Sequence, residues 1–199
     1  MSTDLSPFEG LDVYLFDQLV KGRIHPGMRI LDAGCGGGRN ARWLVGQGAE
    51  VHGVDRNPEA LLRAAEHLGL GEERLQVADL GSLPFEAASF DAVLCCAVLH
   101  FAEDHAAFEG MLDELVRVLR PGGVLFARLA TRTGIEELVR ELGGGRYALP
   151  EDREWYLVSE EELLLHGERR GLELLEPLKA TRVQGLRAMG TWVVKKRDA

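Results

Sequence analysis

A glycine-rich turn with acidic residues around it is the part of this sequence best suited to bind a ligand. The segment ILDAGCGGGRN (residues 30–40) begins with an apolar run that ends at Asp32, and three glycines then alternate: Gly34, Gly36 and Gly38. Glycines let the backbone turn tightly and let a ligand approach the main-chain N–H groups. Asp55 lies 21 residues after Gly34, where a carboxylate can accept two hydrogen bonds from a ribose diol. This spacing predicts a ligand that contains a nucleoside.

A histidine after a long apolar run is the second feature that could do chemistry. His100 and Phe101 directly follow the run FDAVLCCAVL at residues 90–99. Imidazole titrates near neutral pH, so His100 is a candidate general base, and a packed or capping histidine is the alternative. The acidic residues and the second histidine that follow, up to His105, match no compact metal-ligand spacing, so we expect no metal.

The elements that must position these residues alternate along the first 130 positions. Apolar runs predict strands at 28–32, 50–55, 75–78, 90–99 and 124–129. Helices are predicted to begin near Arg39, at Asn57-Pro58 and at Asp104, where the side chain is a ready cap. This alternation specifies a parallel sheet with helices on both faces. The run at 90–99 is apolar on both sides, which is typical of a strand inside such a sheet.

The last part of the chain has a different pattern. Residues 159–170 read as a helix that opens with a possible capping box, formed by Ser159 and Glu162. Leu172–Glu176 and Gly190–Lys196 read as two strands with no helix between them. An antiparallel strand pair that closes one edge of the sheet is the simplest interpretation.

Four segments, in order, resemble the motifs of one enzyme family. They are DAGCGGG at 32–38, VADL at 77–80, LPFEAASFDAV at 83–93 and RVLRPGGVL at 117–125. Together they resemble class I S-adenosylmethionine-dependent methyltransferases over about residues 28 to 130, and Arg39-Asn40 is similar to the small tellurite-resistance type. The resemblance implies an α/β fold: a Rossmann-like, doubly wound sheet of seven mostly parallel strands with an antiparallel last strand. The implied strand order is 3-2-1-4-5-7-6.

The resemblance also implies which residues bind the donor, S-adenosylmethionine. They are Asp32, Gly34, Cys35, Gly36, Gly38, Asp55, Arg56, Asp79, Leu80 and Ala97. At the amino-acid end, Asp32 is implied to orient the ammonium group, which the Ala97 carbonyl also meets. The backbone of residues 34–38 lines the methionyl and ribose portions.

The residues after the second and third strands are implied to bind the nucleoside end of the donor. Asp55 is implied to bind the ribose hydroxyls, and Arg56 to flank the adenine. Asp79 is implied to accept from the adenine amino group, and Leu80 to offer its N–H to a ring nitrogen. A turn or cap carboxylate is the alternative for Asp79.

Two other functions stay open for the same loop. Read from Gly36, GGGRNA fits the dinucleotide pattern G-x-G-x-x-A, so an NAD(P)-dependent oxidoreductase is one alternative. The carboxylate of Asp32 suits an ammonium group and would suit a pyrophosphate badly, which favours the methyl donor. The second alternative is a non-catalytic relative that binds the donor or its product, S-adenosylhomocysteine, without turnover.

Methyl transfer from a sulfonium is a direct displacement, so the protein mainly positions and desolvates the reactants. A base is needed only when the attacking atom must lose a proton. No N/D-P-P-[YF] tetrapeptide and no Pro-Cys pair follow the fourth strand. Within the family that the chain resembles, these absences argue against the enzymes that methylate amino groups of nucleic acids or glutamine and against the cytosine methylases with a cysteine nucleophile. We expect a small-molecule acceptor.

The acceptor pocket is predicted from the segments outside the alternating core. The candidate substrate residues are Tyr14, Phe101, Arg132, Tyr147, Trp155 and Tyr156. The alternative is that the aromatics pin the segments to the body and the arginines are solvated. We interpret 1–199 as a single domain: a helical cap (1–27), the donor-binding core (28–130), a loop-rich substrate or lid insertion (131–158), and the closing helix and strand pair (159–199).

Composition limits the partners. The 199 residues carry 32 acidic and 23 basic side chains, a net charge of −9, which would be repelled by nucleic acid or an anionic membrane surface. The three cysteines form no disulfide framework, and no run approaches the roughly 18 apolar residues of a membrane span. Residues 1–9 show no secretory signal, so we expect a cytoplasmic protein that is a monomer or a homodimer.

Overall fold

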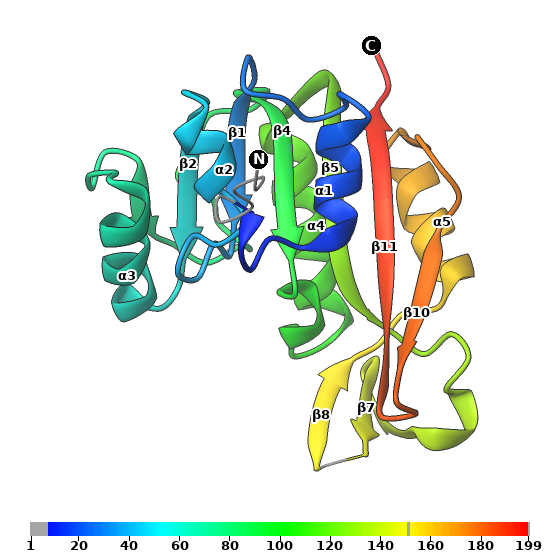
Figure 1. Cartoon of the computed structure of the whole chain (residues 1–199). Helices are drawn as coiled ribbons and strands as arrows, with labels where there is room; N and C mark the ends of the chain where they lie inside the picture. Colours follow the sequence, from blue (N-terminus) through cyan, green and yellow to red (C-terminus); the bar gives the residue numbers. More distant parts are fainter. Residues whose placement is uncertain (1–7, 151, 199) are drawn as a thin grey trace, which may run out of the picture.

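The computed structural model describes residues 8–150 and 152–198 and contains one large mixed sheet (Figure 1). Its strands run in the order β10-β11-β5-β4-β1-β2-β3. The parallel strands are β1 (Arg29–Ala33), β2 (Glu50–Asp55), β3 (Leu75–Val77), β4 (Phe90–Cys96) and β5 (Leu119–Thr131). β11 (Arg187–Lys196) runs antiparallel to β5 and to β10 (Lys179–Val183). The α/β class, the strand order and the antiparallel last strand are confirmed.

The edge that was predicted as one strand at 172–176 is formed by two short strands, of which the second lies beyond the predicted range. β9 (Leu172–Leu174) and β10 pair with opposite ends of β11, so the sheet has eight strands and not seven. Pro177 lies between β9 and β10 and has no N–H to donate to a neighbouring strand. The edge strand therefore breaks there.

Helices cover both faces of the sheet, as predicted. α1 (Val13–Val20), α2 (Arg42–Gly46) and α3 (Pro58–Leu68) pack on one face, and α4 (His105–Val118) and α5 (Glu160–Arg169) on the other. The caps also match the sequence patterns: Asn57 accepts from the Glu59 N–H, Asp104 accepts from the Ala107 N–H, and α5 opens with the expected capping box.

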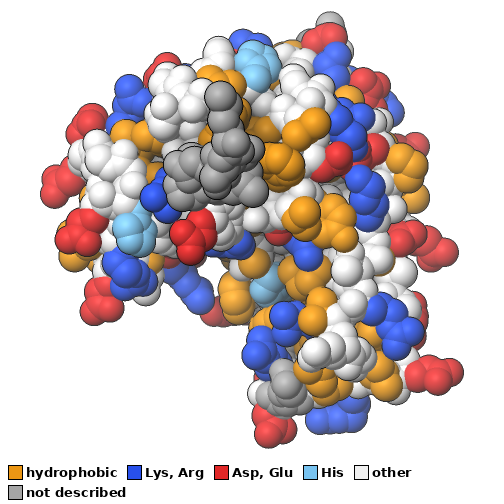
Figure 2. All heavy atoms as spheres, in the orientation of Figure 1, with side chains coloured by type: hydrophobic (Ala, Val, Ile, Leu, Met, Phe, Trp, Pro, Cys, Tyr) orange, Lys and Arg blue, Asp and Glu red, His pale blue; other side chains and the backbone are white. Residues whose placement is uncertain are grey.

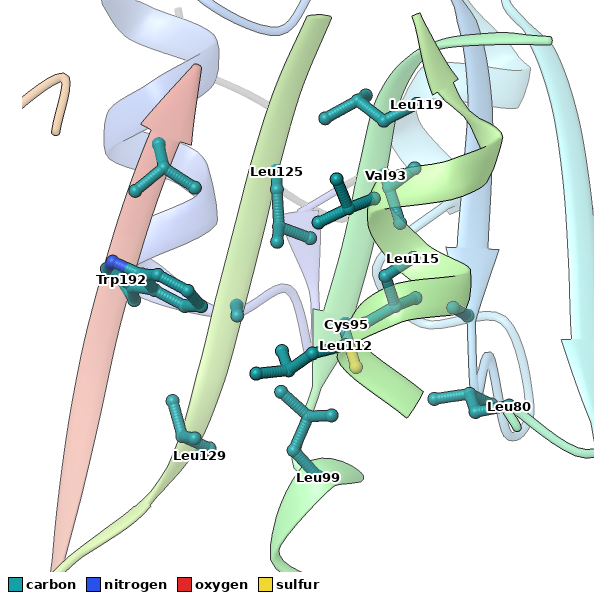
Figure 3. Close-up of a cluster of buried hydrophobic side chains, with 14 of the residues drawn as sticks. Leu80, Val93, Cys95, Leu99, Leu112, Leu115, Leu119, Leu125, Leu129 and Trp192 are labelled. Carbon is teal, nitrogen blue, oxygen red and sulfur yellow. The ribbon is translucent and has the colours of Figure 1, made fainter. Parts of the chain in front are cut away.

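The core lies on both sides of β4. Val93 and Cys95 point to the α4 face, and Leu94 and Cys96 to the α1–α3 face. Figure 3 shows the α4 side, where Leu112 and Leu115 of α4 meet side chains of β4 and β5. The strand ends at Cys96 and not at residue 99, because Ala97 has a φ of 61° and turns the chain into the short 3₁₀ helix η2 (Leu99–Phe101).

The segment 131–158 is not loop-rich, which corrects that expectation. After η3 (Glu136–Leu138) it forms a second, antiparallel sheet of β6 (Arg140–Gly143), β7 (Arg146–Leu149) and β8 (Arg153–Tyr156). Gly143, Gly144 and Gly145 all have positive φ, which makes the tight β6–β7 turn possible. Leu149 and Leu157 pack against Met189 of β11, and the small sheet projects beyond the carboxyl ends of the parallel strands (Figure 1). No helix within the described residues is long and apolar enough to cross a membrane.

Candidate functional site

A cavity of about 490 Å³ lies at the carboxyl ends of β1, β2, β3 and β4. We call it the glycine-loop cavity. Its lining residues are Gly34, Cys35, Gly36, Gly37, Arg39, Asn40, Asp55, Arg56, His67, Ala78, Asp79, Leu80, Cys96, Ala97, Val98, Phe101 and Met111. Eight of the ten residues predicted to bind the donor are among them. Asp32 and Gly38 are not.

The three alternating glycines of the turn differ in what an added side chain would meet. At Gly34 the φ is 77°, and a Cβ would lie 2.3 Å from Val98 Cγ2, so only glycine fits beside the segment after β4. At Gly38 a Cβ would lie 2.7 Å from Leu68 Cδ1, so this glycine lets α3 pack against the turn and does not face the cavity. At Gly36 a Cβ would meet nothing within 4 Å. The open side of the turn is therefore at Gly36, where a ligand can approach the backbone.

Asp55 closes the turn onto the end of β2. Its Oδ2 accepts from the Gly36 N–H at 2.9 Å, and its Oδ1 accepts from the Asn57 N–H at 2.9 Å. Each carboxylate oxygen can accept more than one hydrogen bond, so lone pairs remain for a ligand. The carboxylate is thus held at the cavity wall by the backbone of two elements.

The far end of the cavity is built by residues after β3 and by α4. Asp79 Oδ1 accepts from the Gly81 N–H at 2.8 Å, which makes a local turn, while the residue also lines the cavity. Asp79 therefore has the predicted turn role and a place on the wall at once. Leu80 and Met111 give this end an apolar surface that suits a flat heterocycle.

Asp32 lies behind the glycine turn rather than on its surface. The residue is 1% exposed, and its Oδ2 has no hydrogen-bond partner among the described residues. Burial raises the pKa of this carboxyl to about 7, although Arg39 partly offsets the effect. Arg39 itself donates to the Gly10 carbonyl at 2.7 Å, and Asn40 Oδ1 accepts from the Asp12 N–H at 3.1 Å. The chain before α1 is thereby fastened to the turn.

His100 does not line the glycine-loop cavity. It borders a second cavity of about 400 Å³ together with Arg56, Phe101, Ala102, Glu103, Arg146 and Glu154. The ring is 3% exposed, lies 4.6 Å from the Trp155 ring, and accepts at Nδ1 from the Ala130 N–H at 3.3 Å. Burial, with Arg187 adding to it, lowers the pKa of His100 to about 4. These contacts are those of the packed histidine that was the alternative to a general base.

The predicted acceptor residues are divided by the structure. Phe101 borders both cavities and is half exposed. Trp155 lies over His100 and packs with the small sheet. Tyr156 is in the main core, stacked on Phe108, with its hydroxyl 2.8 Å from His105 Nδ1. The contacts of Tyr156 are therefore those of the alternative, in which the aromatic side chains hold the segment against the body of the protein.

The other predicted acceptor residues also have partners within the protein. Arg132 makes two hydrogen bonds to Glu162, at 2.7 and 2.9 Å, and its guanidinium lies 5.8 Å from the centre of the Tyr147 ring. The Tyr14 hydroxyl is 2.6 Å from Thr181 Oγ1 on β10. None of these three residues lines the glycine-loop cavity. An acceptor that uses them would have to replace those contacts.

Several cavity residues were not predicted. Arg39 and Asn40 were noted only as a subfamily pattern, although they directly continue the turn. Cys96 is part of the apolar run at 90–99, and Met111 lies on α4. No local signal marks Met111, because only the packing of α4 brings it to the cavity. Within residues 8–150 and 152–198, no group of three or more His, Cys, Asp and Glu side chains is arranged to hold a metal ion.

Comparison with known proteins identifies relatives of the whole core. Residues 31–127 match a family profile described as "Methyltransferase domain". The chain is 40% identical over 126 residues to the ubiquinone biosynthesis O-methyltransferase of Methylocella silvestris, covering 62% of this chain and 47% of that protein. It is 35% identical over 156 residues to the Xylella fastidiosa protein of the same name, covering 71% and 61%. The chain thus spans about half to three fifths of the length of these curated relatives.

A solved structure resembles the chain over nearly its full length. It is the 1,6-didemethyltoxoflavin-N1-methyltransferase of Burkholderia thailandensis, with bound 1,6-didemethyltoxoflavin and S-adenosylhomocysteine. The TM-score is 0.69 at 23% identity, and the match covers 98% of this chain and 80% of that chain. At this identity the likeness shows the fold.

Proposed function

The chain carries a methyltransferase domain of the class I, S-adenosylmethionine-dependent type, and on this premise we propose that it transfers the methyl group of S-adenosylmethionine to a small molecule. The observation that carries the proposal is the glycine-loop cavity. It brings together the open turn at Gly36, the carboxylate of Asp55 and the apolar end beside Asp79. Its volume of about 490 Å³ is in the range of small-molecule sites.

The proposed donor site follows the cavity from one end to the other. Asp79 and Leu80 bind the adenine between the apolar walls, and Asp55 binds the ribose hydroxyls with the lone pairs that Gly36 and Asn57 leave free. The backbone at Gly34 and Ala97 borders the amino-acid portion, with Asp32 behind the turn as its anionic counterpart. The dinucleotide alternative fits less well, because this buried carboxyl lies where a pyrophosphate would approach.

The bound donor supplies an activated methyl group, so the chain's own residues act by positioning and by excluding water. The wall next to the turn is formed by Cys96, Ala97 and Phe101. The side chains of Ala97 and Phe101 are apolar. We assign no general base, since His100 is buried against Trp155 and already accepts at Nδ1. An acceptor whose attacking atom needs no deprotonation, or loses its proton to water, suits this wall.

The cavity also favours turnover over mere sensing of the donor. Aromatic side chains of the insertion that plug the cavity would favour a binding protein. Neither Trp155 nor Tyr156 lines it. We propose that residues 131–158 border the acceptor through the second cavity, which shares Arg56 and Phe101 with the first.

A thermal-shift titration with S-adenosylhomocysteine, with NAD(H) in parallel, tests the proposal. At a hundred times Kd, binding adds about 2.7 kcal/mol, or roughly 5–10 °C for a chain of this size. We expect this shift with S-adenosylhomocysteine and none with NAD(H), and a smaller shift for Asp55→Ala. A shift with NAD(H) alone, or no shift with either ligand, would refute the donor assignment.

A further inference from the structure

One charged side chain, a single strand away from the glycine-loop cavity, lines neither cavity and has no role in the proposed donor site. Arg128 lies near the carboxyl end of β5, and its main chain pairs with Cys96 of β4, which lines the cavity. The Ala97 N–H donates to the Arg128 carbonyl at 2.7 Å. Neighbouring strands are about 4.8 Å apart. Arg128 is therefore one strand away from the cavity wall.

α1 covers one face of the sheet (Figure 1), and the contact of the Arg128 guanidinium with Tyr14 of α1 places it on that face. Its side chain is 14% exposed, forms an ion pair with Asp12 (Nε to Oδ2, 3.1 Å), and lies 4.5 Å from the centre of the Tyr14 ring. Nη1 is buried and has no hydrogen-bond partner among the described residues. A buried charged donor without a partner is unfavourable, and such groups in folded proteins usually have a functional reason.

A second polar atom in the same place is also unsatisfied. Thr191 of β11 is directly opposite Arg128 in the β5–β11 register, and its Oγ1 is buried without a partner. The two side chains come from adjacent positions of neighbouring strands and point to the same face. A guanidinium N–H and a hydroxyl that both lack partners suit one anionic oxygen group.

We propose that Arg128, with Thr191 beside it, binds a carboxylate group of a ligand at the methyl-transfer site. The proposal rests on the donor assignment above, because the cavity next to Arg128 is the donor cavity. The carboxylate belongs either to the amino-acid end of the donor or to the acceptor, and both would approach Arg128 from the side of Cys96, which pairs with it and lines the cavity. Arginine recognises a carboxylate by paired, charge-assisted hydrogen bonds, which gives orientation as well as attraction.

Access to Nη1 depends on the chain before α1. Asp12 accepts from the Tyr14 N–H with Oδ1 and pairs with Arg128 through Oδ2, while its own N–H donates to Asn40. Asp12 is thus a carboxylate of the protein that occupies one side of the guanidinium. A ligand carboxylate would compete with Asp12 for the guanidinium. Substitutions of Arg128 and of Asp12 should therefore change the affinity for the ligand in opposite directions.

The opposite alternative is that Arg128 only fastens α1 to the sheet through Asp12. The two roles predict different signs for Asp12→Asn, a substitution that keeps a good helix cap. If Arg128 binds a ligand carboxylate, Arg128→Gln should weaken binding at least tenfold, and Asp12→Asn should leave it unchanged or strengthen it. If Arg128 is only a fastener, both substitutions should weaken binding alike.

Arg23→Gln is the matched control for loosening of α1. Arg23 also ties the α1 end to the sheet, through Glu176 at 2.6 Å and the Leu175 carbonyl at 2.9 Å. It is not among the residues that line either cavity. We expect it to lower the melting temperature without changing the preference for carboxylates.

Two ligand pairs distinguish the sources of the carboxylate. S-adenosylhomocysteine and 5′-methylthioadenosine, which lacks the amino-acid part, are compared by calorimetry. 4-Fluorobenzoate and 4-fluorobenzamide are compared by ¹⁹F NMR on the protein saturated with S-adenosylhomocysteine. A tenfold loss in Arg128→Gln for S-adenosylhomocysteine but not for methylthioadenosine assigns the donor carboxylate. The same loss for the benzoate but not for the benzamide assigns the acceptor.

The outcomes separate this inference from the donor assignment. If the wild type binds no S-adenosylhomocysteine, the proposed function fails. If it binds S-adenosylhomocysteine and Arg128→Gln changes neither ligand pair, the carboxylate proposal is overturned while the proposed function stands. Equal losses in Arg128→Gln and Asp12→Asn overturn it as well.

Discussion

The affinity of the glycine-loop cavity for S-adenosylhomocysteine should depend on pH through Asp32. The carboxyl is 1% exposed, its pKa is raised to about 7, and the proposed ligand presents an ammonium group to it. Only the ionised carboxylate attracts that group, so the apparent Kd is multiplied by the reciprocal of the ionised fraction. With a pKa of about 7, this factor is about 1.1 at pH 8 and about 11 at pH 6. The affinity should therefore fall about tenfold, or about 1.4 kcal/mol, over these two pH units.

Calorimetry at pH 6, 7 and 8 measures this dependence, and repeating it in buffers of different ionisation enthalpy counts the released protons. Asp32→Asn should bind more weakly and show no slope in this range. Asp55→Asn, the other acidic residue of the turn, should bind more weakly but keep the slope. A flat wild-type affinity between pH 6 and 8, or an unchanged slope in Asp32→Asn, would refute the reasoning.

The same group makes a prediction of opposite sign for stability. Its folded pKa of about 7 lies above the ordinary value of 3.8 for this carboxyl group, so the folded state holds the proton more tightly than the unfolded state. The free energy of unfolding should therefore be highest below about pH 4 as far as Asp32 is concerned, and should fall as the pH rises toward 7, by up to about 4 kcal/mol. Asp32→Asn should raise the melting temperature at pH 8 while it weakens the ligand. Scanning calorimetry of both proteins checks this.

Four further predictions concern the rest of the site. Asp55→Ala should stay folded but lose about 1.5–3 kcal/mol of binding free energy for S-adenosylhomocysteine by calorimetry, since charge-assisted hydrogen bonds are lost. Gly34→Ala should destabilise the protein by at least about 1–2 kcal/mol in denaturant titrations, because φ is 77° and the new Cβ would overlap Val98. His100→Asn should lower stability by about 1–3 kcal/mol but leave the pH profile of turnover unchanged near neutrality; a lost inflection there would restore the base role. Deletion of residues 135–155 should reduce acceptor use more than donor affinity, and a folded deletion variant with full turnover would refute a substrate role for the insertion.

Much of the donor-binding core follows from local sequence. The turn at 32–38, the helix starts at Asn57, Asp104 and Ser159, and the doubly apolar β4 are all set by short patterns. Such patterns act within a few residues, so they can be read without knowing the fold. The strand order then follows from the alternation and from the resemblance to a known family.

The features that the sequence did not predict depend on distant parts of the chain or on the backbone of a single residue. The short apolar stretches at 140–156 look like a loop until the three glycines fold them into a sheet against β11. The end of β4 depends on the left-handed backbone of Ala97, which no alanine pattern indicates. The burial of Asp32 and of His100 comes from distant elements that cover them, and burial is what sets their pKa values.

Two ionisable side chains of opposite charge type flank β4 on the same sheet face: Asp32 is buried, and Arg128 is partly buried. Asp32 of β1 pairs with Leu94 of β4, while Arg128 of β5 pairs with Cys96, and both side chains have an oxygen or nitrogen with no partner among the described residues. Arg128 pairs with Asp12 through Nε, but one polar atom of each side chain, Asp32 Oδ2 and Arg128 Nη1, stays buried and unsatisfied within the described part of the chain, which is unfavourable. The amino-acid end of S-adenosylmethionine carries an ammonium and a carboxylate close together. Under the proposals above, a ligand of that chemistry would satisfy both unpaired atoms at once, which would account for two unfavourable groups close to the same cavity.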